Sequence, residues 1–376
     1  MEYLKILQPL NGDYLNSRDG EWRGGALWTE VKTNKKANIN GIDAVYSEAQ
    51  ECFIALVPLF WHRNIIIADD GEEKVKITVF TIKAEFIKRF RISSDDNILF
   101  LKELSEGDYK SIFDHRYLSV YKKAHELYGA KVQLNLFYAF DEKAQTCFSK
   151  RKGSFDLSMM TERYKDEFME NAHWLKLAFH AESEFPDRPY KYASGEKVRE
   201  DYVKIFREVS RFAGRECISN STTVHWGEGN REVVKELRTL GIRSLTGYFE
   251  KDSMGNPLVS YYFDIPTLEH LGNRDFMMDT EADMIFGRID RVLNIGSLSE
   301  VLKDVYEVSE DKHRGGFVSL MIHEQYFYDD YKNYLPDFEE RVLDSCRILI
   351  EKGYKASFIN DIIAEPEAKD SLLFWI

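Results

Sequence analysis

The chain has 376 residues, of which 44% are hydrophobic, and its formal net charge is −13. This length exceeds that of one ordinary domain, and the negative charge argues against nucleic acid or an anionic membrane as a partner. The four cysteines form no CxxC pair, so neither a zinc knuckle nor a disulfide framework is predicted. No signal peptide and no run of transmembrane length are evident, so we expect a cytoplasmic protein.

The first 85 residues contain turn signals at short intervals, and short or alternating apolar runs lie between them. The turn signals are Asn11–Gly12–Asp13, Asp19–Gly20, Asn40–Gly41 and Asp69–Asp70–Gly71. Strands separated by such turns predict a small all-β sandwich for residues 1–85. The segment resembles bacterial immunoglobulin-like modules, and the motifs that carry the resemblance are Ile39–Asn40–Gly41, Val57–Pro58–Leu59 and Arg63–Asn64–Ile65–Ile66.

Residues 86–376 alternate between strand-like and helix-like patterns. The expected strands are 132–137, 174–179, 222–226, 244–249, 317–323 and 356–359. The expected amphipathic helices are 198–213, 233–240 and 338–350, and a glycine follows each of them. Repeated strand–helix units require parallel strands, so this part is predicted to be a distorted (β/α) barrel of seven or eight strands. Residues 247–264 interrupt the alternation and are expected to form a hairpin insertion.

Polar residues with metal-binding or acid–base chemistry end several of the expected strands. Asp95 and Asp96 end the first, His180 and His323 end two others, and His225 ends a fourth. In a (β/α) barrel the chemistry gathers at the carboxyl ends of the strands. Two adjacent carboxylates repel unless a cation lies between them, and imidazole with carboxylate is a ligand set for Zn²⁺, Mn²⁺, Co²⁺ or Ni²⁺.

The order of these motifs resembles the polysaccharide deacetylases, a metal-dependent carbohydrate esterase superfamily with a distorted (β/α) barrel. The resemblance implies that Asp95 is the catalytic base, Asp96 a metal ligand and His323 the catalytic acid. His180 matches the first histidine of the family's His–x–x–x–His motif, whereas Glu184 stands where the second histidine is found. The third metal ligand is therefore either Glu184 or His225, and zinc is the expected metal.

Further polar and aromatic residues are candidates for substrate contact. Arg188 lies in a proline-rich loop after His180, and its alternative role is an ion pair within a structural turn. Trp226 and Glu228 follow His225, where the family has an Arg–x–Pro–x–Gly motif. Tyr326 is placed either to stack on a sugar ring or to pack against the next helix.

The resemblance implies a metal-dependent hydrolase that removes an N- or O-acetyl group from a carbohydrate. Two alternatives are a glycosidase or amidase on the same fold and a non-catalytic carbohydrate-binding protein. The sequence gives no indication of the oligomeric state.

Overall fold

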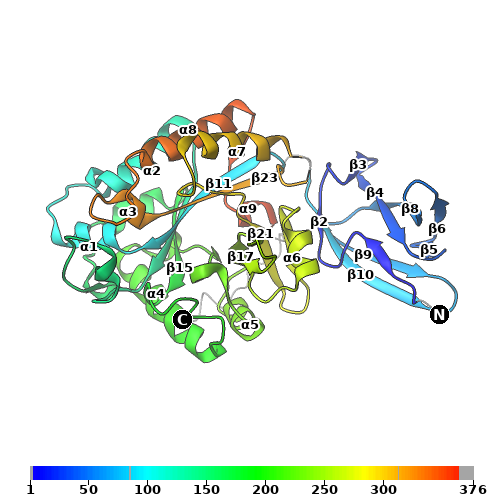
Figure 1. Cartoon of the computed structure of the whole chain (residues 1–376), viewed down its shortest axis with the longest axis horizontal. Coiled ribbons are helices and arrows are strands. Elements are labelled where there is room, and N and C mark those ends of the chain that lie inside the picture. The colour runs from blue at the N-terminus through cyan, green and yellow to red at the C-terminus, as the bar shows by residue number, and fades with distance from the viewer. Residues whose placement is uncertain (1–2, 84–85, 312, 364–376) are drawn as a thin grey trace.

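The structure is a computed structural model that describes residues 3–83, 86–311 and 313–363, and the ends of both predicted domains, residues 85 and 376, lie outside these ranges. The described residues form a mixed α/β protein, as the sequence predicted. An all-strand part and a part of mixed strands and helices lie side by side (Figure 1). None of the helices in the described ranges is long and apolar enough to cross a membrane.

The N-terminal part consists of two sheets around one apolar core. The first sheet contains β1 (Ile6–Gln8), β3 (Gly20–Arg23), β4 (Ala26–Thr33), β7 (Val45–Ser47) and β8 (Cys52–Leu59). The second contains β2 (Tyr14–Leu15), β5 (Asn38–Ile39), β6 (Ile42–Asp43), β9 (Arg63–Asp69) and β10 (Lys74–Thr81). Alternate residues of the long strands, such as Val31, Val57, Ile66 and Val79, fill the space between the sheets. The immunoglobulin-like assignment stays a prediction.

The largest sheet of the C-terminal part is parallel and has the strand order β15-β12-β11-β23-β22. Its strands are β11 (Arg89–Asn97), β12 (Val132–Phe137), β15 (Leu175–Ala181), β22 (Arg291–Val292) and β23 (Phe317–His323), and β24 (Lys355–Ala356) pairs with β11. β12 and β23 have the bounds that the sequence predicted. Nearly every residue of β11, β12 and β23 is buried, as expected for strands covered on both faces.

A second sheet has the order β16-β17-β21-β20. Its strands are β16 (Ser221–Thr222), β17 (Ser244–Gly247), β20 (Phe276–Asp279) and β21 (Met284–Arg288). The strands β18 (Glu250–Lys251) and β19 (Pro257–Leu258) form the predicted hairpin insertion, and a small further sheet pairs β13 (Ala139–Phe140) with β14 (Phe155–Asp156).

Hydrogen bonds connect the two larger sheets at two places. On one side Ser219 N–H donates to the carbonyl of Leu177 in β15. On the other side, after β21, Ile289 N–H donates to Gly247 of β17, and Asp290 N–H donates to Ser319 of β23. The chain after β21 therefore passes from one sheet to the other.

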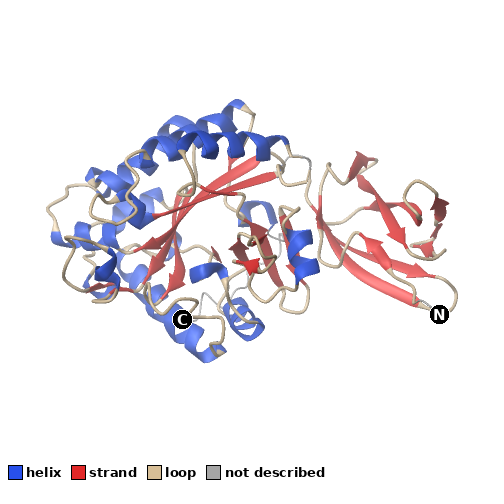
Figure 2. Ribbon diagram, viewed as in Figure 1, coloured by secondary structure: helices blue, strands red, loops and turns tan. Residues whose placement is uncertain are grey.

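Helices lie around the outside of these strands (Figure 2). They are α1 (Leu99–Glu106), α2 (Arg116–Tyr128), α3 (Lys165–Asn171), α4 (Gly195–Phe212), α5 (Arg231–Thr239), α6 (Ile265–Leu271), α7 (Leu298–Glu310), α8 (Phe338–Glu351) and α9 (Asn360–Ile363). α4 shows why they form where they do. The Ser194 side chain caps its first turn, an apolar stripe that includes Val198 and Ile205 is buried, and Gly214 follows its end in a left-handed conformation.

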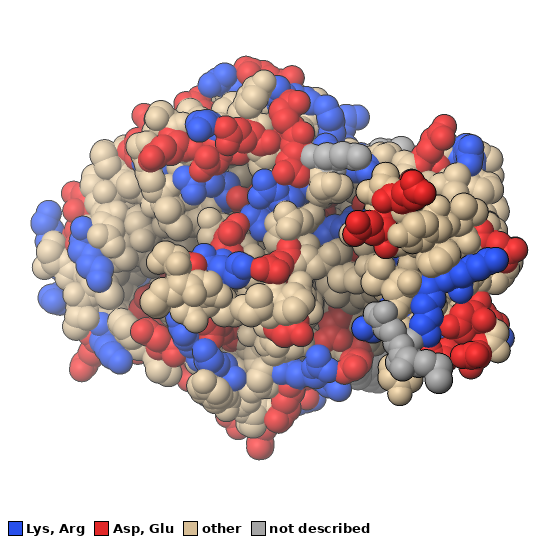
Figure 3. Space-filling model, turned by 45° about the vertical axis from the view of Figure 1, so that its right-hand side comes forward, with Lys and Arg blue, Asp and Glu red and all other residues tan. Residues whose placement is uncertain are grey.

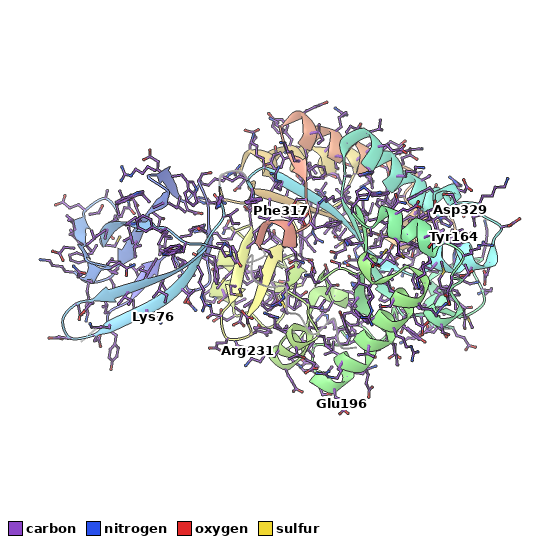
Figure 4. The ribbon with its side chains drawn as sticks, turned by 180° about the vertical axis from the view of Figure 1, so that it is seen from behind. Lys76, Tyr164, Glu196, Arg231, Phe317 and Asp329 are labelled. Atoms are coloured by element: carbon purple, nitrogen blue, oxygen red, sulfur yellow. The ribbon has the colours of Figure 1, made fainter. Side chains whose placement is uncertain are left out.

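The strands of the largest sheet begin near the sandwich and end far from it. Phe317, the first residue of β23, lies toward the sandwich, whereas Asp329, a few residues beyond the end of this strand, lies at the far side (Figure 4). Acidic and basic side chains alternate over the face drawn in Figure 3, without a broad field of one sign. The carboxyl ends of the strands, where the candidate residues lie, therefore face away from the sandwich.

Candidate functional site

A β-bulge places the two adjacent aspartates at the end of β11. Ser94 pairs with Leu134 of β12, and Asn97 pairs with Leu136, so β11 contains one residue more than its partner over this stretch. In a regular strand Asp95 and Asp96 would point to opposite faces of the sheet. Asp96 instead has a left-handed backbone with φ of 61°, and both aspartates are buried. Bulges of this kind redirect side chains next to functional sites.

A second bulge positions His180 on the neighbouring part of the sheet. Leu136 pairs with Phe179 and Phe137 pairs with Ala181, so His180 is the extra residue of β15. Its ring packs against Phe137, with ring centroids 5.2 Å apart. His180 and Asp96 therefore meet at adjacent bulges, and His180 Nε2 lies 3.0 Å from Asp96 Oδ1.

His225 completes a cluster of three converging side chains. Its Nδ1 lies 3.2 Å from His180 Nε2 and 3.3 Å from Asp96 Oδ1. The predicted strand 222–226 is wrong beyond its first residue, because β16 ends at Thr222 and His225 begins the short 3-10 helix η6 (His225–Gly227). Trp226 and Gly227 both have positive φ, so the chain turns sharply here and brings the His225 ring inward.

Two backbone carbonyls determine which ring nitrogens carry hydrogen. His180 Nδ1 lies 2.5 Å from the carbonyl oxygen of Thr223, and His225 Nε2 lies 3.0 Å from that of Glu184. A carbonyl only accepts, so each of these ring nitrogens is a donor. In a neutral imidazole the other nitrogen then carries a lone pair. His180 Nε2, His225 Nδ1 and Asp96 Oδ1 are therefore three acceptors that face one another.

Three converging acceptors need a cation among them. A proton on both facing nitrogens would set two N–H groups against each other, so the cluster has room for one central proton or one metal ion. Ligand atoms about 2.0–2.2 Å from a tetrahedral metal are roughly 3.3–3.6 Å apart, close to the distances found here. Ligating histidines commonly donate their second N–H to a backbone carbonyl, as both histidines do. The donor set therefore fits a zinc-type ion and leaves one position open.

Electrostatics keep Asp96 ionised. Burial alone would raise the pKa of its carboxyl, but when the cluster carries its central proton the hydrogen bonds with His180 and His225, together with the nearby charge of His323, outweigh burial and hold this pKa well below its usual value. Gln325 Nε2 donates to Asp96 Oδ2 at 2.7 Å. Asp96 therefore offers a carboxylate oxygen to the cluster while its second oxygen is held in place.

Asp95 lies at the end of a buried chain of hydrogen bonds. Ser219 Oγ donates to Gln133 Oε1 at 2.8 Å, Gln133 Nε2 donates to Asn135 Oδ1 at 2.8 Å, and Asn135 Nδ2 donates to Asp95 Oδ1 at 2.6 Å. The buried guanidinium of Arg91 lies further back on the same strand. This chain fixes the orientation of the Asp95 carboxylate.

His323 ends β23 beside Asp95, with which it is paired in register. Its Nδ1 lies 2.8 Å from Asn294 Oδ1, which the sequence reasoning missed, and its Nε2 lies 3.9 Å from Asp96 Oδ2. The next residue, Glu324, accepts hydrogen bonds from the N–H groups of residues 98–100 at the start of α1. This contact ties the end of β23 to the end of β11.

Glu184, the other candidate third ligand, lies in a pocket beside the cluster. The structure brings its backbone carbonyl to His225, and Glu184 lines a small pocket together with Asp96 and Gln325. Burial, and then the charge of Asp96, raise the pKa of the Glu184 carboxyl to about 9. The other residues of the wall are Ile98, Leu99, Phe137, Ala139, Phe140, Ala144, Cys147, Phe148 and Tyr331.

Three of the four predicted substrate-contact residues lie together, and the fourth, Tyr326, lies beside His323. The guanidinium of Arg188 lies 5.6 Å from the ring centre of Trp226 and 3.4 Å from Glu228, to which Lys191 is also paired. Trp226 is 43% exposed and its ring lies 6.1 Å from that of His225. Tyr326 lies on the other side, with its ring 5.9 Å from that of His323.

The sequence reasoning named the carboxylates and imidazoles and missed the buried amides around them. Asn135 lies within the expected strand 132–137, and Gln325 lies two residues after His323, so proximity to a predicted strand or candidate residue was the available signal. Asn294 lies far from every motif in sequence and carried no signal. The predicted roles of all these residues stay predictions.

No protein-family model matches this chain, and no curated protein matches it. Among solved structures it is similar to a CE4 family pseudoenzyme from Bacillus anthracis, at 10% identity over 87% of this chain and 90% of the other, with a TM-score of 0.35. It is also similar to a peptidoglycan N-acetylglucosamine deacetylase at 9% identity over 73% and 88%, with a TM-score of 0.35. A third similar structure is a 4-alpha-glucanotransferase from Thermococcus litoralis, at 11% identity over 73% of this chain and 40% of the other, with a TM-score of 0.44.

Proposed function

We propose that this chain is a metal-dependent hydrolase that removes an acetyl group from a carbohydrate amine or alcohol. One observation carries the proposal: three acceptor atoms of Asp96, His180 and His225 face one another within 3.0–3.3 Å, and backbone carbonyls fix both ring tautomers. Such an arrangement is unfavourable without a cation. The proposal does not rest on the similarities to solved structures.

We propose two domains, an immunoglobulin-like sandwich in residues 1–85 and a distorted barrel in residues 86–376. The two largest apolar clusters support this division, because one is confined to residues 4–79 and the other to residues 90–354, while a smaller cluster that includes Tyr14, Phe80 and Phe276 joins the two parts. The barrel would follow the order β11, β12, β15, β16, β17, β21 with β22, and β23. The hydrogen bonds of Leu177 and Asp290 connect the two sheets and support its closure.

The proposed ligands of a divalent ion are Asp96, His180 and His225, and zinc is the favoured metal. When bound there, such an ion supplies Lewis acidity toward a carbonyl oxygen and toward water. Glu184 is the less favoured ligand, because its carboxyl does not join the group of ligand atoms that lie within 4.8 Å of one another among the described residues.

Asp95 and His323 would move the protons. As the oxygen of water forms a bond with the acyl carbon, Asp95 takes up one proton of that water. As the bond from the acyl carbon to nitrogen or oxygen breaks, His323 Nε2 gives a proton to the leaving amine or alcohol. The hydrogen bond to Asn294 leaves Nε2 of His323 free for this task. Arg188, Trp226, Glu228 and Tyr326 are proposed to contact the sugar.

The variant Asp95→Asn tests the assignment of the base. We expect turnover of acetylated sugars to fall about 10²–10⁴-fold, because the amide cannot take up a proton. Zinc content, measured by elemental analysis after dialysis, should stay at one ion per chain. Turnover at the wild-type rate would rule out Asp95 as the base, and a wild-type protein that binds no divalent ion would rule out the metal-dependent reaction.

A further inference from the structure

The side-chain amide of Gln325 makes a hydrogen bond through its nitrogen but not through its oxygen. It lies in the 3-10 helix η7 (Glu324–Phe327), directly after His323. Glu324 anchors this helix through three backbone N–H groups at the start of α1. The backbone of Gln325 is therefore fixed relative to both β11 and β23.

The orientation of the Gln325 amide follows from its contact with Asp96. Its Nε2 lies 2.7 Å from Asp96 Oδ2. Asp96 Oδ2 is the acceptor of this contact, and the opposite orientation of the amide would bring two oxygen atoms together. Nε2 must therefore face Asp96, and Oε1 must point elsewhere.

Gln325 Oε1 lacks a hydrogen-bond donor among the described residues, although the atom is shielded from solvent. Gln325 lines the pocket beside the cluster, together with Asp96 and Glu184. Most of the remaining wall is apolar, as with Leu99 and Phe137, and its polar side chains make no hydrogen bond to Oε1. A buried acceptor without a partner is unfavourable, so this atom favours a ligand that brings an N–H or O–H group into the pocket.

We propose that Gln325 Oε1 accepts a hydrogen bond from the N–H of a substrate amide, so that the site selects N-acyl over O-acyl substrates. An amide offers an N–H next to the carbonyl that reacts, whereas an ester has an oxygen without hydrogen at that position. A site built around such a hydrogen bond discriminates strongly against the analogue that lacks the donor. This inference rests on the proposed function, because it assigns the substrate class of that same site.

The test compares one amide and one ester with the same acyl and aryl groups, 4-nitroacetanilide and 4-nitrophenyl acetate, on zinc-loaded protein. We expect Gln325→Met to lower kcat/KM for the amide about tenfold to a hundredfold more than for the ester. The loss of kcat/KM for the ester measures the effect of removing the contact between Gln325 and Asp96, which affects both substrates. The excess loss on the amide reports Oε1. An equal loss on both substrates overturns the inference.

Two further variants and one binding measurement keep the inference separate from folding and from the proposed function. Gln325→Asn retains both amide groups but withdraws them by one methylene, and it should show the same excess loss on the amide. Gln145→Met changes a buried glutamine that does not line the pocket and should leave both rates unchanged.

If wild-type protein hydrolyses neither substrate, the proposed hydrolase fails, and binding decides the inference. Acetanilide and phenyl acetate are then titrated into metal-free protein, with binding followed by NMR. Tighter binding of acetanilide that is lost in Gln325→Met supports the acceptor role of Oε1. Equal binding of both compounds to wild-type protein overturns it.

Discussion

Buried aspartate–histidine contacts occur at both ends of the parallel strands, and the two ends differ in how donors and acceptors match. At the sandwich-facing end, Asp13 Oδ1 lies 2.5 Å from His270 Nε2, and Asp13 Oδ2 accepts from the N–H of Leu10 at 2.8 Å. Arg274 adds a cation 3.7 Å from the same carboxylate. At the far end, Asp96 meets His180 and His225, and the facing atoms are all acceptors.

The same residue types therefore serve two purposes. Around Asp13 each carboxylate oxygen has a donor, so the contact holds the sandwich against the strands and needs nothing more. Around Asp96 the protein holds acceptors together that repel one another, and this is stable only when something positive binds. Aspartate next to histidine is thus not a sufficient sign of a site, whereas the balance of donors and acceptors distinguishes the two ends.

The sharpest way to break this comparison is to make the same substitution at both ends. Asp96→Asn should abolish zinc binding and turnover, because a side-chain amide replaces a ligand, while the free energy of unfolding of metal-free protein stays close to that of wild type. Asp13→Asn should lower the free energy of unfolding by about 1–3 kcal/mol, because the amide offers one acceptor oxygen in place of the two that meet Leu10 N–H and His270, while Arg274 keeps its pairing with Asp19. Zinc content and urea unfolding measure both effects.

The comparison fails if the two variants behave alike. A large loss of stability in metal-free Asp96→Asn would mean that the cluster is a satisfied structural contact. Loss of zinc in Asp13→Asn would mean that the sandwich-facing end contributes to the site. Each variant is the control for the other.

A buried acid between the two ends predicts a pH-dependent stability. Burial raises the pKa of Asp290 from 3.8 to about 7, although Arg288 lies nearby. The folded state therefore holds a proton that the unfolded chain releases, and this stabilisation is lost as pH rises from about 4 toward 7. Asp290→Asn should remove the effect, so its stability relative to wild type should increase by about 2–4 kcal/mol between pH 4 and pH 8.

Urea unfolding at the two pH values measures this difference. The free energy of unfolding should be similar for the two proteins at pH 4, which serves as the internal control. Parallel pH profiles for both proteins would contradict the prediction and would mean that Asp290 is ionised throughout. Asp290 Oδ2 accepts from the N–H of Ser319, and the asparagine retains an oxygen for that bond.

The sequence predicted the elements well and the side-chain directions poorly. β12 and β23 were placed correctly because buried parallel strands are largely apolar runs, and His323 marks the end of β23. The direction of Asp96 depends on a bulge, which is a property of the register between two strands and leaves no local pattern. His225 remained ambiguous for the same reason, because its position depends on a turn with positive φ at Trp226.

The buried amides were beyond prediction for a different reason. Asn135, Asn294 and Gln325 have no spacing rule, because each is chosen for one partner in space and not for a periodic face. Carboxylates and imidazoles attract notice by their chemistry, whereas an asparagine or glutamine in a strand or turn does not. The supporting hydrogen bonds of a site therefore emerge only from the three-dimensional arrangement.

The buried amide of Asn135 gives a prediction of an intermediate effect on kcat. Asn135→Leu removes the donor to Asp95 while keeping a side chain of similar volume, and it should lower kcat about tenfold to a hundredfold with little change in KM. The reason is that Asp95 loses its fixed orientation but keeps its charge. Asn135→Gln or Asn135→Asp would not restore the orientation of Asp95. Ser219→Ala changes the end of the hydrogen-bond chain that lies farthest from Asp95, so it should have only a small effect on kcat. An unchanged kcat in Asn135→Leu would mean that the hydrogen-bond chain plays no part in positioning Asp95.

The smallest expected effect concerns the exposed aromatic side chain of Trp226. Trp226 is 43% exposed, directly follows the proposed ligand His225, and carries the Arg188 guanidinium near its ring. Trp226→Ala should raise KM for an acetylated oligosaccharide about twofold to tenfold, because an exposed ring offers a stacking surface worth about 0.5–1.5 kcal/mol. The rate at saturation should change little, since the ring is not part of the proton transfers.

Trp61 provides the matched control, because it is a tryptophan of the sandwich that is 74% exposed and lies outside the site. Trp61→Ala should leave KM unchanged. If Trp61→Ala raises KM while Trp226→Ala does not, carbohydrate binds to the sandwich, and the comparison between the two parts of the molecule is reversed. If KM rises only in Trp226→Ala, the substrate is held at the carboxyl ends of the strands, beside the acceptors that need a cation, and the sandwich serves to anchor the opposite end.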